Sequence, residues 1–593
     1  MPEMKKIAKP KNFKKTLKIV LISLKKWRVL LILSLIFAVI SVVLSVAMPK
    51  LLGEITTEAV ASLGATGKID FEPLSKIALA LIILYIISAV FAYFENYICT
   101  LVAARYSAEL RRRLIEKIAR LPISYFDTHK HGDLLSIMSN DIDALASSLR
   151  DNLTTSISSL TTVVGILIMM ISISLPMSLI SVAIVPVSLF FVGKIAKKAQ
   201  DYFVKQRKTL GALNSEIEED YSGQLIIKSN SYEPTATANF SKVNNEYYET
   251  AWKAQFFSSI AFPITHLFTN FGYAATCLLG GYLAIRGELR LGDFQAFIQY
   301  VNQFNRPINE VAQIFPAIQQ TLAAAERVFD FLNAPEEEPD PAQPKALKSV
   351  KGEVEFHDVS FSYDPEKPII KHFSAKIPAG SNVAIVGPTG AGKTTIINLL
   401  MRFYDPTEGY ITIDGVPTRE MKRGDVRDLF GMVLQDTWLF SGSVEDNLRY
   451  GKTSATLPEI RAGAAAASID HIIESFPAGY KTEISEDSDN VSAGEKQLLT
   501  IARVMVANPP MIILDEATSN VDTRTERQIQ TAFEKLTHGR TSFVIAHRLS
   551  TIRNSDLILV MKDGNIVEQG RHDDLLKKNG FYAELYNSQF AEE

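Results

Sequence analysis

Long stretches without charge alternate with polar connections in the first half of the chain. Residues 29–49, 77–94, 152–193 and 254–285 contain no Asp, Glu, Lys or Arg. A helix needs about 20 apolar residues to cross a membrane, so 152–193 is long enough for two crossings. Pro176 disfavours helix for the residue before it and supplies the break. The pattern therefore predicts five spans up to residue 285.

A sixth predicted span, residues 293–322, is more polar and faces other helices or water more than lipid. Glu310 in this span and Glu95 in the second are costly in a membrane. We expect them to meet cationic substrates or to form an ion pair with Arg306. Buried helices of a large soluble protein rarely stay free of charge for so long, so this alternative is disfavoured.

The basic residues predict the orientation. Ten Lys and Arg lie in residues 1–28, eight in 105–150 and nine in 194–253, whereas the opposite connections hold few. The positive-inside rule then places both termini and the two long connections in the cytoplasm of a multi-pass protein of the plasma membrane. Residues 13–27 alternate Lys with apolar residues at helical spacing and predict an amphipathic helix on the inner leaflet; a disordered basic tail is the alternative. No signal-peptide cleavage pattern is visible, so we expect the first span to remain as an anchor.

The two long connections are expected to contact the rest of the chain. The pattern after Arg105 continues as a polar helix, so the second span projects beyond the bilayer. Short turns follow near Phe126 and Tyr221. A solvated loop is the alternative for either turn.

The second half has a different pattern. Residues 333–350 begin with an acidic, proline-rich segment and predict a linker between a membrane domain (29–332, after the basic segment 1–28) and a soluble domain (351–593). Short apolar strands then alternate with helical stretches, which is typical of an α/β fold.

A phosphate loop is the clearest motif of the soluble domain. The sequence Gly387-Pro388-Thr389-Gly390-Ala391-Gly392-Lys393-Thr394-Thr395 follows an apolar strand and precedes a helical run, which is the context this motif requires. Its glycines let backbone N–H groups face phosphates at a helix N-terminus. Lys393 is predicted to reach the β- and γ-phosphates of ATP, and Thr394 to bind Mg²⁺.

A pair of carboxylates follows a second apolar strand, residues 511–514. Asp515 is predicted to hold Mg²⁺ and Glu516 to polarise an attacking water. Alone this pattern is weak, but the phosphate loop makes it a strong prediction.

The order of these motifs resembles the nucleotide-binding domain of ABC transporters. It comprises the phosphate loop, Gln435, the segment Val491-Ser492-Ala493-Gly494-Glu495, Asp515-Glu516, Ser519-Asn520-Val521-Asp522 and His547. With six spans before it, the chain resembles a half-transporter of the multidrug exporter type. The resemblance implies an all-α membrane domain followed by an α/β P-loop NTPase domain with a helical subdomain. It also implies a dimer that binds ATP between one chain's phosphate loop and the other's signature segment.

The resemblance assigns further roles. Tyr363 would stack on adenine, Gln435 would complete the Mg²⁺ sphere, and Glu516 would be the general base. His547 would contact the γ-phosphate, and Ser492 and Gly494 would approach the ATP of the other chain. A core aromatic is the alternative for Tyr363. The turns near Phe126 and Tyr221 would be coupling helices, with Thr482 and Glu483 near them.

The signature segment departs from the family pattern Leu-Ser-Gly-Gly-Gln. Ala493 adds a methyl group where backbone approaches phosphate, and Glu495 adds a negative charge near a polyanion. We therefore expect a heterodimer, in which a second half-transporter completes the site on Glu516; a homodimer that tolerates the change is the alternative.

Composition agrees with two unlike halves. The formal charge of −3 divides into a basic first half, suited to anionic lipid, and an acidic second half. Nothing indicates nucleic-acid binding, and Cys99 and Cys277 are too few for a disulfide framework or a structural zinc site.

ATP-driven export of hydrophobic or amphipathic small molecules is the predicted function. A lipid flippase and an ATP-gated channel or sensor are the alternatives; an importer is disfavoured, and the spans exclude a soluble ABC ATPase. An apolar cavity with a few polar groups suits amphipathic compounds. Its candidate residues, for which plain packing is the alternative, are Phe256, Phe257, Phe262, Phe268, Phe271 and Tyr273 in the fifth span, and Gln299, Asn302, Gln303, Asn305 and Arg306 in the sixth.

Overall fold

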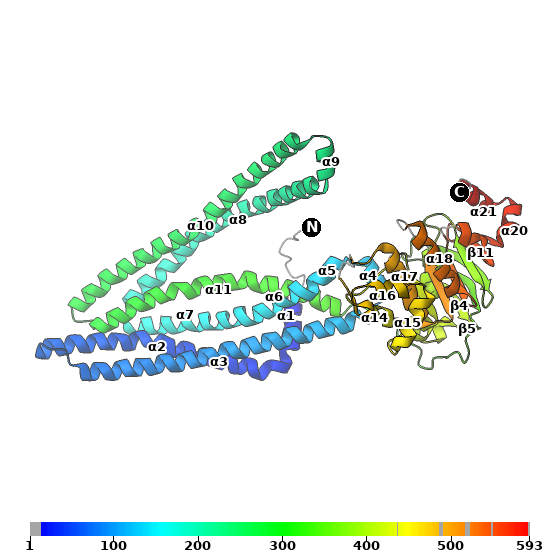
Figure 1. The fold of residues 1–593 in the computed structure, drawn as a ribbon. Helices are drawn as coiled ribbons and strands as arrows, with labels where there is room; N and C mark the ends of the chain where they lie inside the picture. Colours follow the sequence, from blue (N-terminus) through cyan, green and yellow to red (C-terminus); the bar gives the residue numbers. More distant parts are fainter. Residues whose placement is uncertain (1–12, 436, 486–489, 516–521, 547–548, 591–593) are drawn as a thin grey trace. The chain divides into compact units, whose positions relative to one another are not determined.

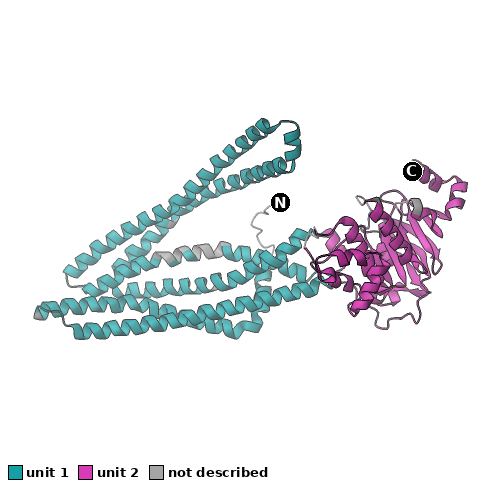
Figure 2. Ribbon diagram, viewed as in Figure 1, with its two compact units in different colours: residues 1–120, 129–335 teal, residues 121–128, 336–593 magenta. Residues whose placement is uncertain are grey.

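The chain forms two compact units (Figure 2). The computed structural model describes residues 13–435, 437–485, 490–515, 522–546 and 549–590. A helical unit comprises residues 1–120 and 129–335, and an α/β unit comprises residues 121–128 and 336–593.

Long helices build the helical unit (Figure 1). Its elements are α1 (Phe13–Ser23), η1 (Leu24–Trp27), α2 (Arg28–Thr66), α3 (Phe71–Ile118), α5 (His131–Ser136), η2 (Ile137–Asp141), α6 (Ile142–Ser147), η3 (Ser148–Asn152), α7 (Leu153–Ile173), α8 (Leu175–Ser222), α9 (Gln224–Ser229), α10 (Glu233–Ile285) and α11 (Leu291–Leu332). Short 3₁₀ (η1) and π-helical (η2, η3) turns interrupt the α-helices.

Four continuous helical segments among the described residues are long and apolar enough to cross a membrane. They are residues 13–65, 71–118, 131–173 and 175–222. The fifth and sixth predicted spans correspond to α10 and α11, which have 53 and 42 residues. Helix α3 has 48 residues, about 70 Å at 1.5 Å per residue, which exceeds a hydrocarbon core of about 30 Å. The predicted break before Pro176 is confirmed, because α7 ends at Ile173 and Ser174 is extended.

The helices fall into two groups. Helix α2 packs against α3, α7 and α11, whereas α8 packs mainly against α10 (Figure 1). The core of the first group holds the fully buried Phe297 and Tyr300, and the Tyr300 hydroxyl donates a hydrogen bond to the Val46 carbonyl (2.7 Å). Helices α2 and α11 approach so closely that a Cβ on Gly53 would lie 2.1 Å from the carbonyl oxygen of Gly292. Small residues allow such close packing in membranes.

The helix predicted at residues 13–27 is present as α1 and η1, and its location on the inner leaflet stays a prediction. Two contacts hold it on α3. The Ser23 and Tyr106 hydroxyls form a hydrogen bond (2.7 Å), and Trp27 packs edge-to-face on Tyr106. Tyr106 is buried, so the residues just before the start of α2 pack directly on α3.

Three sheets, of six, four and two strands, build the described part of the α/β unit together with their helices. Its strands are β1 (Val354–Phe361), β2 (Ile370–Ile377), β3 (Asn382–Val386), β4 (Glu408–Ile413), β5 (Val416–Pro417), β6 (Phe430–Val433), β7 (Gly442–Ser443), β8 (Glu483–Ile484), β9 (Met511–Asp515), β10 (Thr541–Ile545), β11 (Leu557–Lys562) and β12 (Asn565–Gly570). Its helices are α4 (Ile123–Thr128), α12 (Lys393–Leu400), η4 (Thr418–Glu420), α13 (Arg423–Asp428), α14 (Val444–Arg449), α15 (Leu457–Ala466), α16 (Asp470–Ser475), η5 (Gly479–Lys481), α17 (Ala493–Ala507), α18 (Thr523–Thr537), α19 (Leu549–Arg553), α20 (His572–Lys578) and α21 (Phe581–Phe590).

The six-stranded sheet has the strand order β12-β11-β3-β10-β9-β6. Its strands are parallel except β12. Side chains of β3 alternate between two cores: Ala384 packs with residues of α15, α17 and α18, and Val383 packs with α12 and the four-stranded sheet, β2-β1-β4-β5. Burial on both faces is the expected property of a parallel strand. The predicted fold class is confirmed.

Candidate nucleotide site

The phosphate loop, Gln435 and Asp515 lie at one edge of the parallel sheet. The phosphate loop follows β3, Asp515 is the last residue of β9, and Gln435 lies two residues after β6. Since these strands are parallel, their carboxyl ends meet at the same edge. Ligands of open α/β sheets bind outside these carboxyl ends.

The phosphate loop opens directly onto the N-terminus of α12. Gly390 and Gly392 have φ values of 83° and 97°, a region that residues with a Cβ rarely adopt. A Cβ at Gly387 would lie 2.4 Å from the Met561 carbonyl oxygen, so glycine is required there for space. Thr389 and Gly390 are exposed, whereas Ala391 is buried. Within the described part of the chain, no side chain caps α12, so its N–H groups remain open to an anion.

Lys393 is folded back onto the loop. Its ammonium donates hydrogen bonds to the carbonyl oxygens of Gly387 (2.7 Å) and Pro388 (3.1 Å). Burial lowers the pKa of Lys393, and the nearby Asp515 carboxylate opposes this effect. A phosphate would offer the ammonium a charged acceptor in place of neutral carbonyls.

Tyr363 lies beside the same helix. Its hydroxyl contacts the Thr395 hydroxyl (3.4 Å) and accepts a hydrogen bond from the Asn398 amide (3.1 Å). The ring packs edge-to-face on Phe361 and Tyr404 and is 44% exposed. A ring held in this way still has surface for a planar ligand.

Other predicted groups lie at this edge or outside the described residues. Thr394 and Gln435 are exposed, and Asp515 is half-buried. Oxygen donors of this kind suit Mg²⁺. Glu516 and His547 lie outside the described residues.

In the signature segment, the Glu495 side chain caps the N-terminus of α17. Ser492 is the N-cap of α17, and Glu495 forms a capping box with it. The Glu495 carboxylate accepts hydrogen bonds from the Ser492 N–H (2.8 Å) and hydroxyl (2.7 Å). Gly494 is buried and Ala493 is exposed. The Ser-x-x-Glu spacing is the sequence pattern of a capping box and could have predicted this contact, which the reasoning from charge missed.

The candidate substrate residues do not form one set. Phe257 stacks on Tyr202 and Phe268 on Phe191, so both belong to the packing between α8 and α10. Phe256, Phe262, Phe271 and Tyr273 are exposed, as are Asn302 and Gln303, and Gln299 is half-buried. The side chains of Asn305 and Arg306 are outside the described set. Glu310 accepts a hydrogen bond from the Ser159 hydroxyl (2.6 Å), whereas Glu95 Oε1 has no hydrogen-bond partner among the described residues.

One turn of the helical hairpins belongs to the α/β unit. Helix α4, which contains Phe126, clusters with it, and the Tyr404 hydroxyl donates a hydrogen bond to Asp127. At the second turn, Tyr221 near the end of α8 and Leu225 in α9 are 85% and 81% exposed.

Both halves of the chain match family models. The model of the ABC transporter transmembrane region matches residues 31–308, and the model described as ABC transporter matches residues 370–519. The chain belongs to the ABC exporter family. Its members are ATP-hydrolysing transporters, so this exporter is a multi-pass membrane protein with its nucleotide-binding domain in the cytoplasm.

Individual relatives span nearly the whole exporter. A fatty acid ABC transporter ATP-binding/permease protein of Mycobacterium bovis is 44% identical over 87% of this chain and 82% of the relative. A putative multidrug export ATP-binding/permease protein of Bacillus subtilis is 31% identical, covering 95% and 98%. The structure of a bacterial Atm1-family ABC exporter with ATP bound superimposes with a TM-score of 0.70 at 30% identity, covering 94% and 98%.

Proposed function

We propose that this exporter uses ATP hydrolysis to move hydrophobic or amphipathic small molecules out of the cytoplasm. The observation that carries the proposal is the intact phosphate loop at the carboxyl edge of the sheet, in a chain with long apolar helices. ATP closure of two nucleotide-binding domains would be transmitted through the helices to the membrane cavity. Exposed aromatic side chains on α10 and polar ones on α11 offer surface for such substrates.

The residues at the sheet edge fit ATP and Mg²⁺. Lys393 and the open N-terminus of α12 would hold the β- and γ-phosphates, and Tyr363 would stack on adenine. Thr394, Gln435 and Asp515 would bind Mg²⁺, which supplies charge neutralisation to the phosphates. Glu516 would orient and deprotonate the attacking water, and His547 would hold the γ-phosphate.

We further infer that the chain acts as one half of a heterodimer. Its sequence contains the full set of hydrolytic residues. At the signature helix, however, the Glu495 carboxylate already accepts hydrogen bonds from the Ser492 N–H and hydroxyl. The negative charge of Glu495 at this position disfavours binding of the ATP triphosphate. A partner chain with an ordinary signature would complete the site on Glu516. The exposed Tyr221 and Leu225, and the face that α8 and α10 present beyond their mutual contact, favour association with a second chain.

Co-purification tests the heterodimer directly. Two copies of this chain with different affinity tags are produced in the native host, and membranes are solubilised and purified through one tag. We expect a second ABC half-transporter and not the other tagged copy. Recovery of both tags in a stable dimer with strong ATPase activity would overturn the heterodimer and leave the exporter assignment standing.

A lipid substrate is the second candidate, because a 44% identical relative is named a fatty acid transporter. Purified complex in proteoliposomes is assayed for ATPase stimulation by a panel of drugs, fatty acids and fluorescent phospholipids. Stimulation and vectorial movement of drugs support the first candidate. Response to lipids alone supports the second, and the lack of any response would contradict export of amphipathic molecules.

A further inference from the structure

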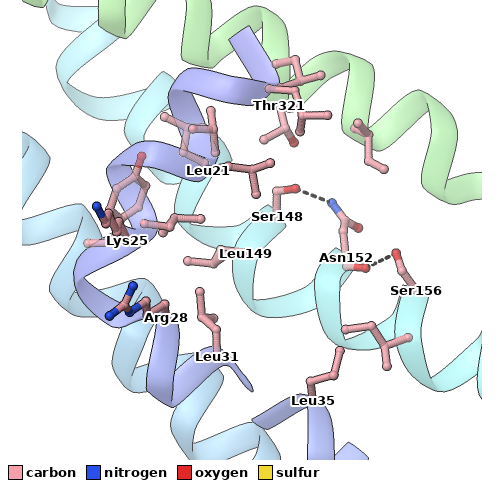
Figure 3. Close-up of a pocket in the computed structure, with 18 of the residues that line it drawn as sticks. Leu21, Lys25, Arg28, Leu31, Leu35, Ser148, Leu149, Asn152, Ser156 and Thr321 are labelled. Carbon is pink, nitrogen blue, oxygen red and sulfur yellow. Dashed lines mark hydrogen bonds between the residues drawn. The ribbon is translucent and has the colours of Figure 1, made fainter. Parts of the chain in front are cut away.

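A pocket of about 480 Å³ lies in the helical unit beside the N-terminal helices (Figure 3). This volume is within the range of roughly 300–1,000 Å³ found for small-molecule sites. Helices α1 and η1 and the start of α2 form one side; α6, η3, α7 and α11 form the other. Part of the wall is η3, a π-helical turn, and such turns are frequent at functional sites.

The pocket is mostly apolar with one polar stripe. Leucines line it from both sides, namely Leu17, Leu21, Leu24, Leu31, Leu35, Leu145, Leu149 and Leu322. The polar stripe lies on η3 and α7. There the Asn152 amide donates a hydrogen bond to the Ser148 hydroxyl (3.0 Å), and the Ser156 hydroxyl donates one to the Asn152 carbonyl (Figure 3). A long alkyl chain could lie along such a surface.

Two cations mark one end of the pocket. Lys25 and Arg28 lie together on the N-terminal helices (Figure 3), and both are exposed. Neither has an ion-pair partner among the described residues, and none of the residues lining the pocket is acidic. The charge of the pocket is therefore unbalanced and complements an anion.

The cation-bearing wall is fixed in place. Tyr106 lines the pocket and is 2% exposed. Its hydroxyl forms a hydrogen bond with Ser23, and its ring packs against Trp27. The segment that carries Lys25 and Arg28 is thus anchored on α3 on both sides of Lys25. A fixed pair of cations loses less entropy on binding than a flexible basic tail.

We propose that this pocket binds one anionic phospholipid of the cytoplasmic leaflet. The phosphate lies at Lys25 and Arg28, and one acyl chain lies among the leucines. The positive-inside rule places this end of the helical unit at the cytoplasmic surface, where anionic lipids gather. Leu21 and Ile32 are 61% and 56% exposed at the pocket, as expected for side chains that face lipid. The site does not depend on which substrate the exporter moves.

Photo-crosslinking tests the site in the intact complex. The complex is reconstituted in phosphatidylcholine nanodiscs with increasing amounts of a phosphatidylglycerol that carries a photoreactive acyl chain, and labelled peptides are identified by mass spectrometry. We expect labelling within residues 17–35 or 145–157. The double variant Lys25→Gln/Arg28→Gln should raise the phosphatidylglycerol content needed for half-maximal labelling by about 30-fold, because each cation near an anionic surface contributes about 1 kcal/mol.

Matched variants separate this pocket from general surface charge. Lys14→Gln/Lys18→Gln removes the same charge from α1 at residues that do not line the pocket, and should leave labelling unchanged. Leu149→Trp keeps both cations and fills the pocket, and should abolish labelling while the complex still assembles. Equal loss in the Lys14/Lys18 variant, or unchanged labelling in both pocket variants, would overturn the proposal.

Two competitors test the identity of the lipid. Photoreactive phosphatidylcholine of the same chain length should label these peptides weakly; equal labelling would overturn the role of the two cations. Excess unlabelled phosphatidylglycerol should displace the probe. Displacement by oleate but not by phosphatidylglycerol would overturn the phospholipid in favour of a free fatty acid.

Discussion

Two helix N-termini of the α/β unit differ in whether a side chain of the chain itself caps them. Helix α12 begins after Gly392, with its N–H groups open and Lys393 resting on the loop carbonyls. Helix α17 begins after Ser492, and the Glu495 carboxylate already accepts hydrogen bonds there. The partial positive charge of a helix N-terminus attracts an anion in both cases. In α12 the anion must come from outside, whereas in α17 the chain supplies its own.

This difference teaches how one family fold can hold unequal sites. Glu495 is in the first turn of α17 and is not among the buried residues of the helix, which include Leu498 and Ile501. The altered residue acts only through charge and hydrogen bonding at the exposed first turn. A chain can therefore keep the fold of an ABC nucleotide-binding domain while its signature helix carries its own anion at the N-terminus.

The largest effect is expected when the proposed general base, Glu516, is replaced. Glu516→Gln should lower ATP turnover of the intact complex by about 10²–10⁴-fold, because general-base catalysis contributes this much. ATP binding should persist, since the amide keeps the shape of the side chain. Phosphate release and nucleotide retention measure the two effects. Glu534→Gln, an exposed carboxylate on α18, is the control; turnover near wild type in Glu516→Gln would rule out this residue as base.

A second test removes Lys393, the cation proposed to bind the phosphates. Lys393→Ala should weaken ATP binding by about 10–100-fold, the range expected for hydrogen bonds to a charged group. Titration with a fluorescent ATP analogue measures the affinity. Lys371→Ala removes an exposed lysine from β2 and should bind normally. Unchanged affinity in Lys393→Ala would show that the loop backbone alone holds the phosphates.

Tyr363 allows a smaller test at the adenine end. Tyr363→Ala should weaken ATP binding by about two- to tenfold, because an aromatic contact contributes about 0.5–1.5 kcal/mol. Tyr363→Phe loses the contacts with Thr395 and Asn398 but keeps the ring, so its affinity should stay near wild type. A phenylalanine variant as weak as the alanine variant would mean that the hydroxyl contacts, and not stacking, position the loop helix.

Local patterns predicted what depends on neighbours in sequence. The break at Ser174, the helix at 13–27 and the strand–loop–helix around Lys393 are encoded by proline, by apolar spacing and by glycine, all within a few residues. The fold class followed from the order of such elements. The Ser492–Glu495 contact was equally local and was missed because the charge of Glu495 was considered without its capping geometry.

Contacts between distant helices were not predictable in this way. Phe257 and Phe268 formed part of a candidate substrate set, but their partners Tyr202 and Phe191 lie on α8, more than 50 positions away. Nothing in the spacing of the aromatic residues on α10 distinguishes those that pack from those that stay exposed, such as Phe262. The pocket beside Lys25 likewise depends on the packing of the α11 residues 318–322 against α1 and η3, more than 160 positions away.

The smallest effect is expected at the signature helix, and it bears most directly on the comparison. Glu495→Gln keeps the capping geometry, since glutamine also serves a capping box, but removes the negative charge. In the heterodimer we expect the partner's nucleotide site to bind ATP about two- to fivefold more tightly, the range given by a charge at a helix N-terminus.

Helix α15 offers a matched control for this change. Its capping box pairs Thr456 with Glu459, whose carboxylate accepts hydrogen bonds from the Thr456 N–H (2.7 Å) and hydroxyl (2.8 Å). Glu459→Gln removes the same charge from the same motif outside the signature segment, so nucleotide binding should not change. Equal tightening in both variants would assign the effect to overall charge. No tightening in either would mean that α17 is kept from phosphate by the methyl group of Ala493, which then becomes the residue to change to glycine.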